Sequence, residues 1–444
     1  MAKTYYFIGI KGTGMGPLAQ ILHDQGNTVL GSDIDTYTYT QAPLEAAGIK
    51  ILSFDSKNVD AHKEAIFVRG NAFTDDHIEV ARALALGVTM LSYPDAVQEQ
   101  IAQTTSIAVA GAHGKTSTTG LLAHVLKNIA PTSYLIGDGT GRGVPNSQFF
   151  VVEADEYRRH FKDYAPDYAI LTNIDFDHPD YYTGIEDVTS AFSDFANHVK
   201  KAIFAWGDDA HLRTLQPNAD VYYYGTNVEK DDFVATNIHK STQGSHFDVV
   251  FRGEQLGEFG VPLFGQHSIL NALAVIAVSY MEQVDLNLIR EYLMTYQGVK
   301  RRFSEKQIAD ITVIDDYAHH PTEIDATLDA ARQKYPNKQI IAIFQPHTYS
   351  RVIAYKDEFA RSLEAADKVY LVNIFGSARE KKGSVTSAEI GAEISKFGGI
   401  VDENDMSLLM PYENAVMVFM GAGDIEKYEF AYEKLLGQLR TDLQ

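Results

Sequence analysis

Short apolar runs alternate with amphipathic stretches along most of the chain. Residues 5–10 predict a buried strand, a glycine turn follows, and apolar positions recur at helical spacing over residues 15–25. Further apolar runs of strand length follow at residues 28–31, 65–69, 89–92, 106–110, 149–153, 168–172 and 202–206. This alternation is typical of parallel sheets flanked by helices, so it predicts an α/β fold.

The pattern changes twice further along the chain. Residues 220–264 hold shorter β-like segments, which predict an antiparallel addition, and a helical stretch follows at about 269–283. After Gly298 the pattern restarts, with buried-strand candidates at residues 312–316, 339–344, 368–374 and 415–420. We therefore predict three domains: a Rossmann-like domain over residues 1–97, a central P-loop-type ATPase sheet over 98–298, and a Rossmann-like domain over 299–444. A chain of 444 residues is too long for a single hydrophobic core, which agrees with several domains.

Composition removes several classes of function. The chain has 38 basic and 59 acidic residues, a formal charge of -21, which argues against nucleic acid or an anionic membrane as a partner. It has no cysteine, which excludes disulfides, thiolate metal sites and cysteine nucleophiles. We find neither an apolar signal core nor an apolar run long enough for a bilayer, so we expect a cytoplasmic protein without membrane insertion.

A glycine-rich segment between the strand at 106–110 and a helical pattern predicts a phosphate-binding loop. Glycines let backbone N–H groups approach phosphates, and the helix N-terminus favours negative charge. Lys115 is expected to neutralise phosphate charge and the Thr116 hydroxyl to reach Mg²⁺. Val109 stands where the strict eight-residue pattern begins with glycine, so a plain turn capped by Thr116 is the alternative. The loop predicted to bind ATP is Gly111-Ala112-His113-Gly114-Lys115-Thr116-Ser117.

Two acidic segments follow neighbouring predicted strands. Glu153 closes the run at 149–153, and His178 lies in the segment Asn173-Ile174-Asp175-Phe176-Asp177-His178 after the run at 168–172. Ligands of open parallel sheets bind beyond the carboxyl ends of the strands, and hard oxygen ligands suit Mg²⁺. We therefore predict a Mg²⁺ site at Thr116, Glu153 and His178. For Glu153, a helix cap or an exposed acid is the alternative.

The order of these motifs along the chain resembles the Mur ligases of peptidoglycan synthesis. The resemblance covers all three predicted domains, and the combination is far more specific than any one motif. Besides the phosphate loop and the two acidic segments, it rests on Phe7-Ile8-Gly9-Ile10-Lys11-Gly12-Thr13-Gly14-Met15, Gly265-Gln266-His267-Ser268, Gly298-Val299-Lys300-Arg301-Arg302-Phe303 and Asp315-Asp316-Tyr317-Ala318-His319-His320-Pro321.

The resemblance implies an ATP- and Mg²⁺-dependent ligase that joins L-alanine to the carboxylate of UDP-N-acetylmuramate through an acyl phosphate. Phosphoryl transfer of this kind depends mainly on positioning and charge neutralisation. The implied partners are these two small molecules, and the implied state is a monomer or a homodimer. The implied catalytic residues are Lys115, Glu153, His178, Arg302 and His319.

The resemblance also assigns binding roles. His267, Asn271 and Arg302 correspond to nucleotide contacts, and Tyr317, His319 and Arg351 correspond to positions that handle alanine. For His319, the roles of proton acceptor and of orienting group stay open, as does a purely structural role. The turn that would hold the uridine diphosphate moiety comprises Gly9, Lys11, Gly12, Thr13, Gly14 and Met15, with Asp33 beyond the second strand.

Three positions depart from the family pattern. Ser268 replaces a common asparagine of the adenine motif, and Thr348 stands where many members have an arginine. Lys11 replaces a common glycine, so it is either an additional cation near the diphosphate or a lysine that faces solvent.

Three other functions compete with this interpretation. A related ligase attaches a recycled muropeptide tripeptide to the same nucleotide sugar, although Tyr317 and residues 345–351 favour the alanine enzyme. A nicotinamide-dependent oxidoreductase would use Gly9-x-x-Gly12-x-Gly14 with Asp33, but this glycine spacing is not the usual one. A non-catalytic nucleotide switch would bind ATP without turnover.

Overall fold

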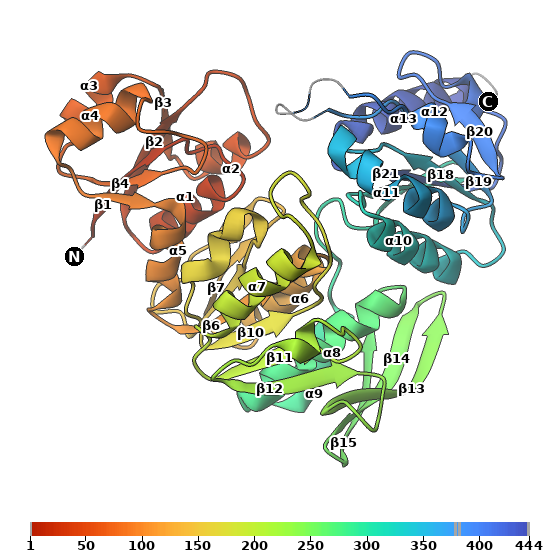
Figure 1. Cartoon of the computed structure of the whole chain (residues 1–444), viewed down its shortest axis with the longest axis horizontal. Coiled ribbons are helices and arrows are strands. Elements are labelled where there is room, and N and C mark those ends of the chain that lie inside the picture. The colour runs from red at the N-terminus through yellow and green to blue at the C-terminus, as the bar shows by residue number, and fades with distance from the viewer. Residues whose placement is uncertain (1, 377–379, 381–382, 442–444) are drawn as a thin grey trace. The chain divides into compact units, whose positions relative to one another are not determined.

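A computed structural model describes residues 2–376, 380 and 383–441 of the chain (Figure 1). The chain divides into two compact units. The first unit comprises Met1–Ile174, Glu186–Phe233 and Ala274–Tyr292, and the second unit comprises Asp175–Ile185, Val234–Leu273 and Leu293–Gln444.

The first unit begins with a five-stranded sheet in the order β3-β2-β1-β4-β5, all parallel. Apolar residues of β1, such as Tyr6 and Ile8, pack with Phe67 of β4 and with Val80 and Ala83 of one helix face. The strands are β1 (Thr4–Ile8), β2 (Thr28–Asp33), β3 (Lys50–Ser53), β4 (Ile66–Arg69) and β5 (Met90–Ser92), and the helices are α1 (Met15–Asp24), α2 (Gln41–Ala46), α3 (Ser56–Ala61), α4 (Ile78–Leu86) and α5 (Tyr93–Ile101).

The same unit holds the larger part of a second sheet, in the order β12-β11-β10-β6-β9-β7-β8. Its strands are parallel except β8, which is antiparallel to β7. The strands are β6 (Thr105–Ala110), β7 (Thr132–Ile136), β8 (Thr140–Arg142), β9 (Phe149–Glu153), β10 (Tyr168–Leu171), β11 (Ala202–Trp206) and β12 (Asp220–Gly225). The helices of this region are α6 (Lys115–Lys127), η1 (Tyr157–Asp163), η2 (Leu212–Thr214) and, from its second residue onward, α7 (Ile185–Ala196). Two further helices are divided between the units: α8 (Gln266–Met281) belongs to the first unit from Ala274 onward, and α9 (Leu286–Met294) belongs to it up to Tyr292.

The second unit contains β13 (Phe233–Ser241) from its second residue onward, β14 (Gly244–Phe251) and β15 (Glu254–Val261). The pairing of β14 with β15 is antiparallel, which confirms the antiparallel addition predicted within residues 220–264. The turns of this segment are glycine-rich, and the strands alternate buried and exposed positions, as expected for a sheet with one covered face.

A six-stranded sheet forms the rest of the second unit, in the order β16-β17-β21-β18-β19-β20, with only the β16–β17 pair antiparallel. Alternate residues of β18 pack into two hydrophobic cores on opposite faces of the sheet. One core contains Ile340, Ala342 and Phe344, and the other contains Ile341 and Ile343. Both faces are therefore covered, which explains the continuous apolar runs. The elements are β16 (Ser304–Ile308), β17 (Ile311–Asp316), α10 (Pro321–Lys334), β18 (Ile340–Phe344), α11 (Tyr349–Leu363), β19 (Lys368–Leu371), α12 (Ser387–Gly391), β20 (Phe397–Ile400), η3 (Ser407–Leu409), β21 (Val416–Met420) and α13 (Ile425–Thr441).

These three sheets confirm the predicted α/β class and the order of a Rossmann-like, a P-loop-type and a second Rossmann-like sheet. The predicted strands at 149–153 and 202–206 coincide with β9 and β11, and most others differ by one or two residues. The domain limits at 97/98 and 298/299 stay predictions. None of the helices that the structure describes combines the length and the apolar character that a bilayer-spanning helix needs.

Candidate active site

The predicted phosphate loop connects the end of β6 to the start of α6 and is held rigidly. Gly111 has φ 151°, and a Cβ atom there would lie 1.9 Å from Thr172 Oγ1, so only glycine fits. Gly114, with φ 83°, caps α6. The loop is tied to the end of β10 because Ala112 N donates to Asn173 O at 3.1 Å and His113 N donates to Asn173 Oδ1 at 2.9 Å.

Lys115 is the first residue of α6, and its side chain reaches back across the loop. Its Nζ donates to Gly111 O at 2.6 Å and to Ala112 O at 3.2 Å, and it forms an ion pair with Glu156 Oε2 at 2.7 Å. Burial lowers the pKa of Lys115, but Glu156 and two nearby carboxylates outweigh burial and raise it. Lys115 is therefore a fixed positive charge at the mouth of the loop.

Glu153 ends β9 beside the first turn of α6. Its Oε1 accepts a hydrogen bond from Thr116 Oγ1 at 3.2 Å, and its Oε2 accepts one from Gly137 N at 2.8 Å. Burial raises the pKa of Glu153, while Lys115 and the two hydrogen bonds oppose the rise. The structure thus brings Lys115, Thr116 and Glu153 together at one edge of the sheet.

The donor chemistry of this edge fits a magnesium ion. A hydroxyl and a carboxylate oxygen are hard ligands, and Mg²⁺ usually completes its shell with water and phosphate oxygens. The third predicted ligand, His178, follows β10 in the chain but belongs to the second unit. Its backbone is left-handed, with φ 57°, and its Nε2 lies 3.8 Å from Asp177 Oδ2.

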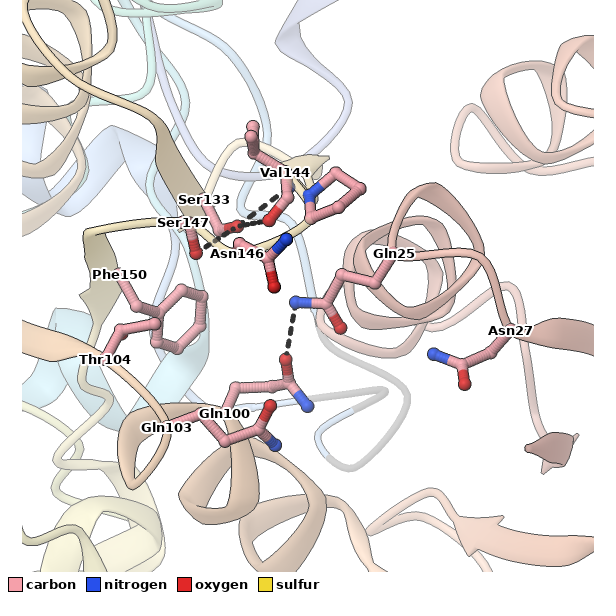
Figure 2. Close-up of a pocket in the computed structure, with 11 residues that line it drawn as sticks. Gln25, Asn27, Gln100, Gln103, Thr104, Ser133, Val144, Asn146, Ser147 and Phe150 are labelled. Carbon is pink, nitrogen blue, oxygen red and sulfur yellow. Dashed lines mark hydrogen bonds between the residues drawn. The ribbon is translucent and has the colours of Figure 1, made fainter. Parts of the chain in front are cut away.

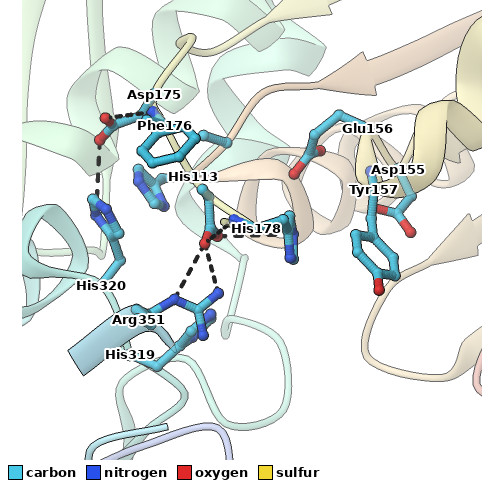
Figure 3. Close-up of polar contacts among 12 residues, drawn as sticks. His113, Asp155, Glu156, Tyr157, Asp175, Phe176, His178, His319, His320 and Arg351 are labelled. Atoms are coloured by element: carbon cyan, nitrogen blue, oxygen red, sulfur yellow. Dashed lines mark hydrogen bonds and ion pairs between the residues drawn. The ribbon is translucent and has the colours of Figure 1, made fainter. Parts of the chain in front are cut away.

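The segment Asp175–Ile185, which carries His178, is fastened to α10 and α11 within the second unit (Figure 3). Arg351 donates to Asp177 Oδ1 through Nε at 3.2 Å and through Nη2 at 2.6 Å, and both side chains are almost fully buried. Tyr355 donates its hydroxyl proton to Phe176 O. His320 caps the start of α10, and its Nδ1 lies 3.7 Å from Asp175 Oδ2.

The residues expected to handle alanine form a connected set of contacts after β17. The ring of Tyr317 has the Arg302 guanidinium 5.5 Å from its centroid and meets the His319 ring edge-on at 5.4 Å. Glu323 joins them, because its Oε1 lies 3.3 Å from Arg302 Nη1 and its Oε2 accepts from His319 N at 2.9 Å. His319 Nδ1 also lies 2.9 Å from Tyr317 O, which fixes its ring.

The set continues from His319 to Arg351 through His347. The rings of His319 and His347 meet edge-on at 6.0 Å, and His347 Nδ1 lies 3.2 Å from Arg351 Nη1. Burial, with the neighbouring His319 and Arg351, lowers the pKa of His347 to about 3, so this imidazole is neutral at physiological pH. Thr348, the position of the missing arginine, has φ 62° and turns the chain into α11.

His267 and Asn271, the predicted nucleotide contacts, lie one turn apart on α8. Burial lowers the pKa of His267 to about 4, so its ring is neutral. Its Nδ1 is buried and has no hydrogen-bond partner among the described residues. Ser268, at the position of the common asparagine, donates to Phe264 O at 2.6 Å.

In the N-terminal turn, Gly12 and Thr13 are exposed and Met15 is buried at the start of α1. Lys11 is buried, and its Nζ donates to Ile34 O and Thr36 O, both at 2.6 Å, and to Gln41 Oε1 at 3.1 Å. These acceptors use all three donors of the ammonium group, so Lys11 does not face solvent and fixes the loop 34–41. Its contact with a diphosphate stays a prediction.

Asp33 is engaged in the same way. Its carboxylate accepts from Lys11 N at 2.7 Å and from Ile34 N at 2.8 Å. Both carboxylate oxygens of Asp33 therefore accept hydrogen bonds from backbone N–H groups. This weighs against a role for Asp33 in binding the ribose of a nicotinamide cofactor, as an oxidoreductase would need.

Comparison with known proteins accounts for nearly the whole chain. Residues 4–105 match the model of the Mur ligase family, catalytic domain, residues 109–279 that of the Mur ligase middle domain, and residues 301–423 that of the Mur ligase, glutamate ligase domain. The chain belongs to the Mur ligase family. The three matches follow one another in the same order as the three sheets.

Individual Mur ligases are very similar to this one. A UDP-N-acetylmuramate–L-alanine ligase of Leuconostoc mesenteroides is 88% identical over 443 residues, covering 100% of both chains. A ligase of the same name from Ligilactobacillus salivarius is 60% identical over 98% of both chains. Among solved structures, the UDP-N-acetylmuramate-alanine ligase of Thermotoga maritima has a TM-score of 0.80 at 28% identity, covering 98% of this chain and 99% of that one. A murein peptide ligase of Psychrobacter arcticus has a TM-score of 0.70 at 25% identity, with the same coverage.

Three residues of the candidate site were not predicted as site residues from the sequence. Glu156 pairs with Lys115, and Glu323 links Arg302 to His319. His347, which lies between His319 and Arg351, is the third. Glu156 could have been found from the run Glu153-Ala154-Asp155-Glu156, which places a second carboxylate just beyond β9. No local pattern marks the other two.

Proposed function

We propose that this protein joins L-alanine to the carboxylate of UDP-N-acetylmuramate, with hydrolysis of ATP to ADP and phosphate, in peptidoglycan synthesis. The observation that carries the proposal is the convergence of Lys115, Thr116 and Glu153 on the glycine loop, in a chain 88% identical to a ligase of that name. Because ATP is its energy source, we expect it to act in the cytoplasm, as a monomer or a homodimer.

The first step activates a poor electrophile. A carboxylate oxygen of UDP-N-acetylmuramate attacks the γ-phosphorus of ATP, the bond to the β-phosphate oxygen breaks, and ADP leaves. The loop backbone positions the phosphates, and Lys115 offsets the negative charge of the transferring group. Glu156 keeps Lys115 protonated and pointed at the loop.

Magnesium would be held by Thr116, Glu153 and His178. When bound, it supplies charge neutralisation to the phosphate oxygens and orients the terminal phosphate. Glu153 is suited to this role because Thr116 and Gly137 fix its two oxygens in position.

The second step forms the amide bond. The neutral amine of alanine attacks the acyl carbon, a tetrahedral intermediate forms, and phosphate leaves with the former carboxylate oxygen. We assign Arg351 to the carboxylate of alanine and Tyr317 and His319 to the position of its amine. His319 can take the proton that the amine loses, since its ring is oriented by Tyr317 O.

The test is ADP formation by the full chain with each substrate omitted in turn, followed by mass measurement of the nucleotide product. We expect ADP formation that depends on both UDP-N-acetylmuramate and alanine, and a product heavier by one alanyl residue. ATP binding without such turnover would identify a nucleotide switch and contradict the proposal.

A second candidate is the attachment of a recycled tripeptide, because the fold is also similar to a murein peptide ligase. The same assay with tripeptide in place of alanine separates the two functions. Turnover with the tripeptide and none with alanine would show that the protein attaches the tripeptide and would contradict our assignment.

A further inference from the structure

The first unit contains a cavity of about 320 Å³ away from the phosphate loop (Figure 2). Residues of the turn between α1 and β2 line it, with the end of α5 and the segments that lead into β7 and β9. These segments lie at the amino ends of the strands, whereas the phosphate loop lies at the carboxyl end of β6. The cavity is therefore separate from the proposed catalytic site.

Carboxamides dominate the polar lining of the cavity. Gln25, Asn27, Gln100, Gln103 and Asn146 line it, and none of the described residues around it carries a charge. Gln25 Nε2 donates to Gln100 Oε1 at 2.9 Å, and Gln100 is only 4% exposed. Each carboxamide offers both donors and acceptors, so this wall suits a ligand whose groups do the same.

Hydroxyl groups complete the polar wall. Ser133 Oγ donates to Ser147 Oγ at 3.1 Å and accepts from Val144 N at 2.9 Å. Thr104 Oγ1 is buried and has no hydrogen-bond partner among the described residues. Buried hydroxyls are normally paired, so Thr104 is a group that a ligand would satisfy.

We propose that this cavity binds a neutral carbohydrate, with one sugar ring inside it. Sugar hydroxyls pair with carboxamides and hydroxyls in either direction, and Val144 and Pro145 offer apolar surface to the C–H face of the ring. The described lining has no cation, and the formal charge of the chain is -21, so phosphates and carboxylates are disfavoured. The volume lies at the lower end of small-molecule sites, which fits a monosaccharide.

Occupancy of the cavity would link two sheets of the first unit. Gln25 and Asn27 lie in the turn that leads into β2 of the first sheet, whereas Ser133 and Phe150 belong to β7 and β9 of the second. A ligand that bonds to both sides stabilises the folded unit by mass action, in addition to any effect on turnover.

The test is calorimetric titration and thermal unfolding of the full chain with glucose and with N-acetylglucosamine, in the presence of ATP. Glucose 6-phosphate and uridine serve as comparison ligands. We expect saturable heat and a saturable rise in Tm with a neutral sugar and none with glucose 6-phosphate. No saturable signal with either sugar across the millimolar range, or binding of uridine alone, would overturn the proposal.

Variants locate the site. Thr104→Val and Gln103→Ala should each weaken sugar binding by about three- to tenfold, the range that one lost net hydrogen bond gives. Asn128→Ala, an exposed asparagine just beyond α6 and outside the cavity, should leave binding unchanged. Gln103 is exposed, so its variant tests the site even where Thr104→Val does not fold. Sugar binding unaltered in Gln103→Ala, and in any folded Thr104→Val, contradicts the assignment.

Discussion

The phosphate loop of the first unit and the alanine cluster of the second unit (Tyr317, His319 and Arg351) are built differently. The loop is one strand–turn–helix segment, and backbone hydrogen bonds and two glycines fix its shape. The alanine cluster depends on side chains from separate segments, with Asp177, Glu323 and His347 as links. The loop should therefore tolerate loss of a neighbouring side chain with its fold intact, whereas the cluster should lose structure and function together.

The largest expected effect concerns the loop. Lys115→Ala should reduce kcat by about 10³-fold, because a preorganised charge that acts in the transition state is lost. The melting temperature should fall, because the buried carboxylate of Glu156 loses its ion pair with Lys115, but the backbone contacts of the loop should keep the protein folded. ADP release measures the first effect and thermal unfolding the second. Lys127→Ala, an exposed lysine at the other end of α6, is the matched control and should behave as the parent. A Lys115→Ala variant with near-normal turnover would refute the phosphate site.

The alanine cluster should respond in both properties. Asp177→Ala leaves the buried guanidinium of Arg351 without its carboxylate, which should cost about 3–5 kcal/mol of stability. The KM for alanine should also rise. Denaturant unfolding and initial rates measure these two quantities. The double variant Asp177→Ala/Arg351→Met should regain part of the stability and none of the alanine affinity. Unchanged stability in the single variant would show that the ion pair does not organise the cluster.

A smaller effect is expected from His267. Burial lowers its pKa in the folded protein to about 4, whereas an unfolded histidine has a pKa of about 6.5. Between these pH values only the unfolded chain binds the proton, so stability should fall as the pH drops from about 6.5 to about 4. In His267→Asn this contribution is absent, and the loss of stability between pH 7 and pH 5 should be smaller. Identical pH profiles of urea unfolding would contradict the assignment.

The smallest effect concerns Lys11. Lys11→Met retains the apolar stem but removes three hydrogen bonds to the loop 34–41. We expect the KM for UDP-N-acetylmuramate to rise only a few-fold, as roughly one net hydrogen bond would predict, with an unchanged dependence on ionic strength. A larger rise whose salt dependence disappears in the variant would show instead that Lys11 contacts the diphosphate.

The same contrast explains what the sequence could predict. The loop follows from Gly111, Gly114 and Lys115 between two strongly patterned elements, because its geometry is local. The sheets follow from apolar runs that are buried on both faces. The pairing of Arg351 with Asp177, 174 positions apart, has no local trace, because only tertiary packing brings the two together. The burial of Lys11 could not be predicted for the same reason. The groups that accept its hydrogen bonds are mainly backbone carbonyls, whose positions do not depend on residue type.

The central claim is that the sugar carboxylate becomes an acyl phosphate at the loop of Lys115. The most direct test uses UDP-N-acetylmuramate labelled with ¹⁸O in its carboxylate, with alanine and unlabelled ATP, and mass analysis of the released phosphate. One ¹⁸O atom should appear in each phosphate, because the oxygen that attacks the γ-phosphorus leaves with it when the amide forms. Phosphate free of ¹⁸O, alongside formation of the alanyl product, would contradict this account.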